Sequence, residues 1–173
     1  MFRSFFLFIF LIFFSYNHAF SENNIAFVDI NYIFNNSSAG KKVNKDVKNQ
    51  TSKLNSELKK YIDKINDDKK KLMAQKNVLS KEEFEKKFRK LEENLNEYNI
   101  IIKKKNNDLK TLKKKYRIEF SNKLKGILED YSKKNSISMI LSKENIIIGK
   151  TNLDATKDVL NLFDKSVKKI SAQ

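Results

Sequence analysis

The sequence predicts an α+β protein that is mostly α, in which a long antiparallel helical hairpin forms a coiled-coil arm on a small β-containing body. Three observations predict this fold. Residues 41–116 contain neither Pro nor Gly, apolar residues recur through them at helical spacing, and a strong helix start divides the stretch in two. Each of the two segments, 41–76 and 81–116, has 36 residues. At a rise of ~1.5 Å per residue they would fold back as an arm about 54 Å long.

The helix start that divides the arm is the segment Leu79-Ser80-Lys81-Glu82-Glu83-Phe84. Ser80 can accept a hydrogen bond from the N–H of Glu83, and the Glu83 carboxylate can accept one from the N–H of Ser80. Leu79 can pack against Phe84 as a hydrophobic staple. The residues just before Ser80 are therefore expected to form the turn at the arm tip.

Apolar residues mark one face of each arm helix. In the second segment they follow a 4-3-4-3 heptad spacing that only Lys105 interrupts. In the first segment they repeat every eleven residues. The heptad positions are Phe84, Phe88, Leu91, Leu95, Tyr98, Ile102, Leu109, Leu112 and Tyr116, and the eleven-residue repeats are Val43, Leu54 and Ile65, Val47 and Leu58, and Ile62 and Met73. A two-helix arm encloses little core, so its base must supply the remaining stability.

The remaining segments predict the body. Residues 25–30 are expected to form a buried strand and 31–34 a helical turn, with a break and N-cap residues at 35–38. The apolar stripe of the second arm helix continues to about Lys134, which gives a helix about 82 Å long at ~1.5 Å per residue. Ile137–Leu141 and Asn145–Gly149 are expected to pair as an antiparallel hairpin.

A terminal amphipathic helix is expected after residues 152–156, with Asp154 or Thr156 as its cap. Its apolar residues extend to near the C-terminus and comprise Val159, Leu160, Leu162, Phe163, Val167 and Ile170.

Residues 1–21 are predicted to be a signal peptide. Arg3 precedes an apolar run over 5–14, and Ala19-Phe20-Ser21 places small residues at the cleavage site. The run is shorter than the ~20 residues of a membrane span. An uncleaved anchor is the alternative.

The composition argues against most enzyme classes. The only His lies in the predicted signal peptide, and the chain has no Cys. Zinc sites and Cys/His or Ser/His nucleophile systems are therefore not expected, nor are disulfides. The three Gly residues stand alone, so no phosphate loop is predicted. No cofactor, metal or enzymatic activity is expected, although chemistry with carboxylates or Lys alone is conceivable.

Positive charge is concentrated on the predicted arm. Residues 41–116 hold 24 Lys and Arg against 12 Asp and Glu, whereas the rest of the mature chain has 11 against 9. A basic cluster at the tip is the main candidate for binding acidic chains or lipid headgroups. It comprises Lys69, Lys70, Lys71, Lys76, Lys81, Lys86, Lys87, Arg89 and Lys90. A solvated helical face is the alternative interpretation of each of these residues.

A few other residues are assigned roles. Ile100 and Ile101 lie off the heptad face, so they either contact the first helix or offer an apolar lining to a bound chain. Phe84 and Phe88 are predicted to be core residues of the arm. Asp29 and Asp154 lie at element ends and are assigned turn or cap roles.

The order of these segments resembles the Skp/OmpH family of periplasmic chaperones. At the front the resemblance lies in Ile25-Ala26-Phe27-Val28-Asp29 and Ser38-Ala39-Gly40-Lys41. At the back it lies in 137–141, 146–148 and 152–156, followed by Val159 and Leu162. It spans the mature chain and depends on the order and spacing of these segments.

The resemblance implies a periplasmic homotrimer whose three arms surround a cavity for unfolded outer-membrane proteins, held without ATP. It implies a trimerisation body made of residues 22–40 and 117–173, with the arm at 41–116. Expected trimer-body residues are Ile25, Phe27, Val28, Ile30, Ile140, Leu141, Ile146 and Ile148. The alternative is an exported basic coiled coil that binds anionic lipid or nucleic acid without chaperone activity. Nucleic acid is not expected, because base-reading and stacking residue clusters are missing.

Overall fold

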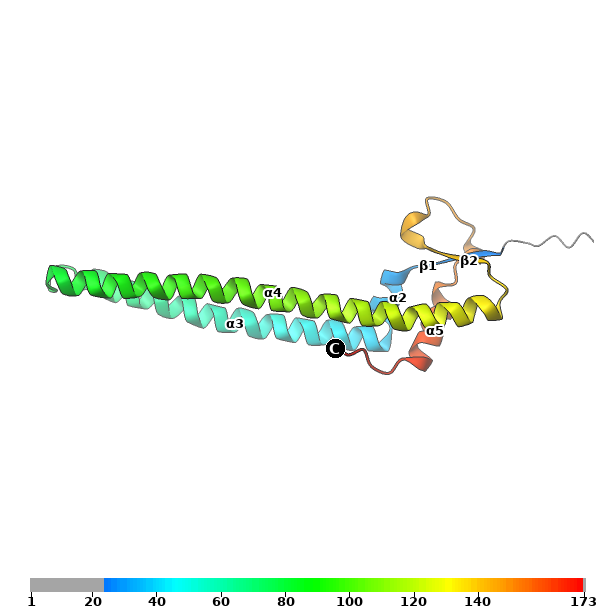
Figure 1. The fold of residues 1–173 in the computed structure, drawn as a ribbon, viewed down its shortest axis with the longest axis horizontal. Coiled ribbons are helices and arrows are strands. Elements are labelled where there is room, and N and C mark those ends of the chain that lie inside the picture. Colours follow the sequence, from blue (N-terminus) through cyan, green and yellow to red (C-terminus); the bar gives the residue numbers. More distant parts are fainter. Residues whose placement is uncertain (1–23, 173) are drawn as a thin grey trace, which may run out of the picture.

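The computed structural model describes residues 24–172, and it is a long helical hairpin on a small body (Figure 1). The hairpin is α3 (Ser38–Ala74) and α4 (Lys81–Lys134). The body contains β1 (Ile25–Val28), α2 (Ile30–Asn36), β2 (Met139–Ser142) and α5 (Thr156–Ser166). The predicted fold class is confirmed. The predicted signal peptide, 1–21, lies outside the described residues.

The arm begins at a tight junction between α2 and α3. Ser37 donates its backbone N–H to the carbonyl of Ile33 at 2.9 Å, which closes α2. Its Oγ accepts from the N–H of Gly40 at 3.1 Å, which caps α3. Because one fully buried residue serves both helices, α3 leaves the body in a fixed direction.

The predicted helix start at the arm tip is confirmed. Glu83 N–H donates to Ser80 Oγ at 3.2 Å, and Ser80 N–H donates to the Glu83 carboxylate at 3.1 Å. The Ser80 hydroxyl also donates to the Glu83 carboxylate at 2.8 Å, and this bond, with the one from the Ser80 N–H, lowers the pKa of Glu83. Leu79 and Phe84 both pack on the apolar cluster near the tip. The predicted end of α4 at Lys134 is also confirmed.

Ser80→Ala should lower the free energy of unfolding by about 1 kcal/mol, because it removes the cap of α4. Urea unfolding followed by circular dichroism measures this change. Ser56→Ala is the matched control. Ser56 lies exposed inside α3, where Ala is the better helix former, so that variant should be no less stable than the wild type. Equal losses in the two variants would contradict the capping role.

Two apolar clusters hold the hairpin together. The tip cluster is built on Ile65, Leu72 and Leu91, and Tyr61 stacks on Tyr98 beside it at 5.6 Å. The root cluster joins the arm to the body, and its buried members are Ala26, Val28, Ile33, Ala39, Val43, Phe120, Leu124, Ala155, Val159, Phe163, Val167 and Ile170. The residues that join the body to the arm are thus separated from the tip cluster by the middle of the arm.

Two residues predicted to face the helix contact are exposed. Phe88 is 43% exposed and stacks on Phe84 at 6.3 Å, so its assignment to the core was wrong. Met73 is also exposed, and its neighbour Leu72 is buried instead. The reason is geometric: a helix with one partner buries a narrow stripe, which is narrower than the face that the repeats mark.

The sheet consists of two parallel strands. β1 pairs with β2 in the register Ile25↔Met139 to Val28↔Ser142. Parallel strands need a long crossover connection. Here that connection contains the entire arm, so pairing of the two strands closes the hairpin at its base. Because α4 runs unbroken from the tip to the body, the predicted boundary between arm and body at residue 116 stays a prediction.

The predicted antiparallel strand pair after α4 is wrong. β2 ends at Ser142 and is followed by a 3-10 turn, Lys143–Asn145, and residues 146–150 form no strand. Lys143 Nζ contacts Asp154 Oδ2 at 2.8 Å and lies 5.7 Å from the centre of the Phe27 ring. These contacts direct the chain across the end of β1 instead of back along β2.

The last helix is shorter than predicted. α5 ends at Ser166, so Val167 and Ile170 lie beyond it, although both are buried. The N-cap position is Ala155, so neither Asp154 nor Thr156 caps α5 as predicted. Asp154 instead closes the turn just before the helix, where its Oδ1 accepts from the N–H of Thr156 at 3.0 Å. Phe163 packs against Phe120 of α4 with ring centres 5.1 Å apart. α5 therefore covers the base of the arm.

Candidate binding surfaces

The predicted basic cluster lies at the end of the arm, on the last turns of α3, the turn and the first turns of α4. All nine of its side chains are exposed. Lys87 Nζ donates to Gln75 Oε1 at 3.1 Å, which links the two sides of the tip. Among the described residues, only Arg89 and Lys90 of this set form ion pairs, with Glu85 at 4.0 Å and Glu93 at 3.1 Å.

The tip therefore offers many weak cationic contacts. An exposed ion pair contributes about 0.2–1 kcal/mol, so no single Lys here can hold a ligand tightly. The positive field reaches roughly 10 Å at 0.1 M salt before it is screened. The arrangement suits an extended acidic partner that touches several of these residues together.

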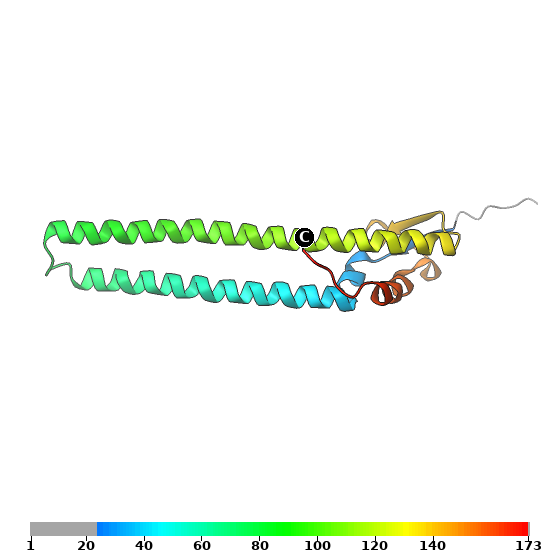
Figure 2. The same ribbon diagram turned by 60° about the horizontal axis from the view of Figure 1, so that its bottom comes forward.

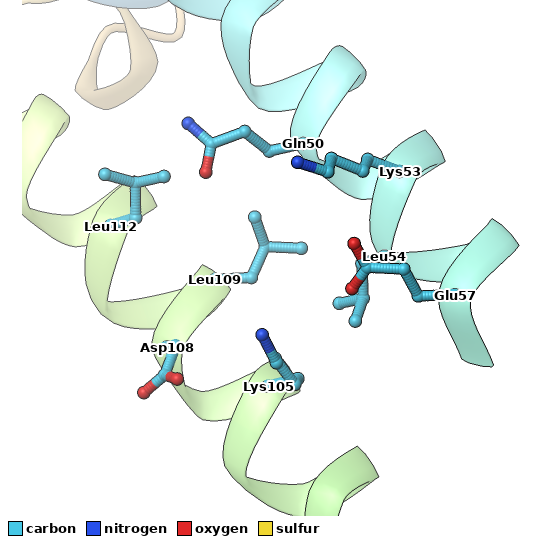
Figure 3. A pocket seen from close by; sticks show the side chains of 8 residues that line it. All are labelled: Gln50, Lys53, Leu54, Glu57, Lys105, Asp108, Leu109 and Leu112. Carbon is cyan, nitrogen blue, oxygen red and sulfur yellow. The ribbon is translucent and has the colours of Figure 1, made fainter. Parts of the chain in front are cut away.

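The middle of the arm is loosely packed. Leu54 of α3 and Leu109 and Leu112 of α4 line a pocket of about 530 Å³ between the helices (Figure 3). Lys105 enters it where the heptad pattern calls for an apolar residue, so the helices lack an apolar pair at this level. The rim is polar and comprises Gln50, Lys53, Glu57, Lys105 and Asp108. The pocket is shallow and has room for an aliphatic side chain.

Ile100 and Ile101 lie one to two turns nearer the tip. Ile100 is 66% exposed, whereas Ile101 is half-buried. Contact with α3 therefore explains the partial burial of the Ile101 side chain, whereas the Ile100 side chain makes little contact with α3. Ile100 is the one of the two that is accessible to a partner in the single chain.

Of the eight predicted trimer-body residues, four are buried or half-buried within the subunit and four are exposed. Phe27 and Val28 are buried within the subunit, and Ile140 and Ile146 are half-buried. The exposed group is Ile25, Ile30, Leu141 and Ile148, the last of them 91% exposed. Sequence reasoning missed two exposed neighbours, Met139 and Ile147. Their signals were the alternation of Met139 with Leu141 and the run of three Ile residues.

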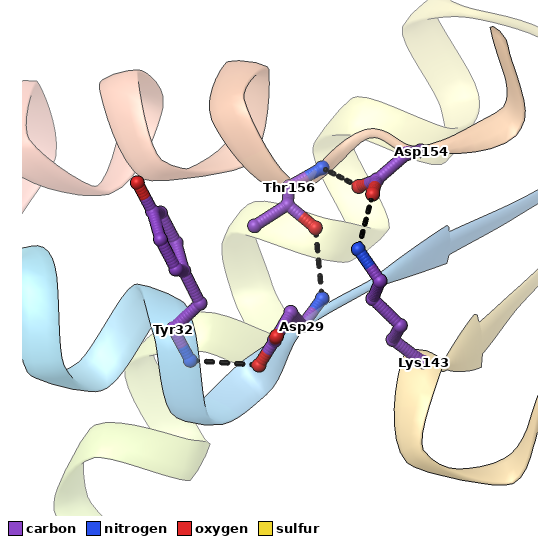
Figure 4. A network of polar contacts seen from close by, with 5 residues as sticks. All are labelled: Asp29, Tyr32, Lys143, Asp154 and Thr156. Carbon is purple, nitrogen blue, oxygen red and sulfur yellow. Dashed lines mark hydrogen bonds and ion pairs between the residues drawn. The ribbon is translucent and has the colours of Figure 1, made fainter. Parts of the chain in front are cut away.

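A polar network holds the base together (Figure 4). Asp29 caps α2 by accepting from the N–H of Tyr32 at 2.7 Å, and its own N–H donates to Thr156 Oγ1 at 2.9 Å. Burial acts to raise the pKa of Asp154, but hydrogen bonds from Lys143 and Thr156 outweigh it and leave the pKa lowered. The same bond to Asp154 raises the pKa of Lys143. Asp29 and Asp154 thus have the structural roles predicted for them.

Across the root of the arm, Tyr116 donates from its hydroxyl to Asp46 Oδ2 at 2.8 Å. That hydrogen bond, with burial, raises the pKa of Tyr116. The bond joins α4 to α3 at the inner edge of the arm. It fixes the two helices relative to each other just before they enter the body.

Two further properties bear on the kind of site present. Within residues 24–172, no helix is both long and apolar enough to cross a bilayer. Among the same residues, no three acidic, His or Cys side chains gather closely enough to hold a metal ion. The available surfaces are a cationic tip, a shallow mid-arm pocket and an apolar face on the body.

These features define a class of protein: a small α/β body that carries a long helical hairpin. The family model described as outer membrane protein (OmpH-like) matches residues 24–163, and the chain belongs to this OmpH-like family. No curated protein matches the chain.

A similar fold is seen in a crystal structure from Caulobacter crescentus CB15, described as an OmpH-like outer membrane chaperone. The TM-score is 0.79 over 86% of this chain and 88% of that one, at 17% sequence identity. The likeness covers both the body and the arm. At this identity it concerns the fold.

Proposed function

We propose that this protein is an ATP-independent periplasmic holdase that works as a homotrimer. Its three arms would enclose an unfolded outer-membrane protein and prevent its aggregation before membrane insertion. Membership of the OmpH-like family supports this function. The single observation that carries it is the arm itself, a narrow cationic rod that projects far from a thin base (Figure 2).

Two features of the body support the proposal that the protein is a trimer. Its sheet has only two strands within the described residues, and large apolar side chains stand exposed around it. A two-stranded sheet is marginal in water, and exposed apolar groups of this kind favour association. Other copies of the chain are the proposed occupants of this face, with Ile25, Ile30, Leu141 and Ile148 at the contact.

The surface of the arms supports the proposal that an unfolded client is bound reversibly. Three arms around one client would present many contacts at once, each weak, so the high effective concentration inside the cavity replaces tight sites. Cationic tips would contact acidic stretches of the client. Ile100 and the mid-arm pocket would contact its aliphatic residues. Because each contact breaks readily, release needs no nucleotide and no cofactor.

Aggregation of a diluted unfolded β-barrel protein tests the proposal. Light scattering is measured with and without the mature protein, and suppression near one trimer per client is expected. Suspended anionic liposomes are tested in parallel by pelleting. Pelleting without suppression would favour the alternative function, an exported coiled coil that binds anionic surfaces. Suppression together with pelleting would add anionic lipid as a second partner.

Replacing Lys69, Lys70 and Lys71 by Gln should weaken client capture several-fold at low salt, because it removes three adjacent cations from the tip. The difference from the wild type should shrink at 0.5 M salt, where the screening length is only a few Å. Fluorescence anisotropy of a labelled client measures both effects. The matched control replaces three exposed body lysines, Lys150, Lys157 and Lys165, by Gln. Client binding that does not depend on salt, and that is weakened equally in the two variants, would contradict a role for the tip.

A further inference from the structure

The chain beyond α5 returns to the arm. From Val167 to residue 172 it is neither helix nor strand. In both views it leaves the end of α5 near the start of α3 and runs back alongside the hairpin (Figures 1 and 2). We call residues 167–172 the C-terminal strap. The strap follows the region that the OmpH-like family model covers, 24–163.

The strap is attached by side chains. Val167 and Ile170 are buried members of the root cluster, whereas Lys168 and Lys169 between them are exposed. The N–H of Val167 donates to the carbonyl of Phe163 at 2.7 Å, which closes α5. Among the described residues, the backbone of 168–172 forms no hydrogen bond with another backbone group. Lys168 Nζ donates only to the carbonyl of Asp164, at the end of α5.

This mode of attachment makes the strap releasable. Burying the Ile170 side chain favours the bound state. Ordering the backbone of residues 168–172 opposes it, and no ladder of backbone hydrogen bonds adds to the gain. Release beyond Val167 leaves α5 capped and its buried residues, Val159 and Phe163, in place.

Release would uncover apolar surface at the root of the arm. The buried arm members of the root cluster are Ala39 and Val43 of α3 and Phe120 and Leu124 of α4, with Val47 and Tyr116 half-buried at its edge. They lie where the two helices meet the body. In the proposed trimer, three such sites would ring the roots of the arms.

We propose that the strap is a displaceable cover over an apolar site at the arm root, and that the competing ligand is an aliphatic-rich, extended segment of an unfolded protein. The identity of the ligand rests on the proposed holdase function; the displaceable cover does not. The strap itself indicates the ligand chemistry, because it presents two aliphatic residues, Val167 and Ile170, from an irregular chain.

Ile170→Ser tests the cover in the full mature chain. The control is Lys169→Ser, which places the same residue at an exposed neighbouring position. The probe is a fluorescein-labelled peptide with the sequence of residues 164–173, measured by anisotropy. We expect the peptide to bind Ile170→Ser at least tenfold more tightly than the wild type or Lys169→Ser. We also expect cooperative thermal unfolding to be retained in all three proteins.

The outcomes separate the parts of the proposal. Equal peptide binding by all three proteins, or none by Ile170→Ser, would overturn the cover, as would loss of cooperative unfolding in Ile170→Ser, since Ile170 would then be ordinary core. An unfolded β-barrel protein should displace the bound peptide from Ile170→Ser. If it does not, the ligand assignment fails. Failure of the wild type to suppress aggregation would overturn the holdase function alone, because peptide binding is measured without a client.

Discussion

Gly40→Ala is expected to lower the free energy of unfolding by about 1–3 kcal/mol or more, the cost of overpacking a close contact. A Cβ at position 40 would lie 1.7 Å from the carbonyl oxygen of Phe34 and 2.8 Å from its carbonyl carbon. Both are backbone atoms of α2, so they cannot rotate away. The α2–α3 junction would have to open, and the Ser37 caps would be strained. Urea unfolding followed by circular dichroism measures the loss.

Gly126→Ala is the matched control for this change. Gly126 lies inside α4, and nothing stands within 4 Å of an added Cβ there. Ala is the better helix former, so this variant should gain about 0.5–1 kcal/mol. The same chemical change is therefore expected to have opposite signs at the two positions. Two gains would show that the junction tolerates a side chain and does not fix the direction of the arm.

The long helices could be predicted from the sequence because their signals are local. A Pro- and Gly-free stretch, periodic apolar residues and a capping box at Ser80 all act within a few residues of where they stand. The end of α4 at Lys134 followed from the same stripe. What the pattern overstated was the width of the buried face, because the single partner helix leaves Phe88 and Met73 in solvent.

The sheet could not be predicted in this way. β1 and β2 are four residues each, and they pair across the whole arm. No local sequence signal near β2 indicates that its partner is β1, which is distant in the sequence. The short link at 142–144 instead suggested a hairpin with the segment that follows. The contacts that decide the matter, from Lys143 to Asp154 and to the Phe27 ring, are themselves long-range.

The sequence predicted the exposed lysines of the tip better than it predicted which apolar residues of the body are exposed. The lysines of the tip had to be exposed, since charged side chains on a thin arm have nowhere to be buried. The apolar body residues were not separable by sequence. Val28 and Ile148 both lie in short runs of apolar, β-branched residues, yet Val28 lies in the core of the subunit and Ile148 is exposed to solvent.

Ile148→Asp should convert the proposed trimer into monomers. Ile148 is 91% exposed in the single chain, so the substitution should leave the subunit fold within about 0.5 kcal/mol of the wild type. In a trimer that buries this face, however, an unpaired carboxylate would be removed from water in each subunit. That penalty is several kcal/mol per charge, enough to abolish a micromolar assembly. Light scattering coupled to size exclusion measures the mass.

Val78→Asp is the control that separates interface burial from a general effect of charge. Val78 is 84% exposed and β-branched like Ile148, but it lies at the arm tip, far from the body. This variant should remain trimeric. A trimer that survives Ile148→Asp would remove this face from the interface, and a wild type that is monomeric at micromolar concentration would remove the cavity. If instead Ile148→Asp yields folded monomers that no longer suppress aggregation, while trimeric Val78→Asp retains most of its suppression despite the added negative charge at the tip, enclosure by several arms is what holds the client.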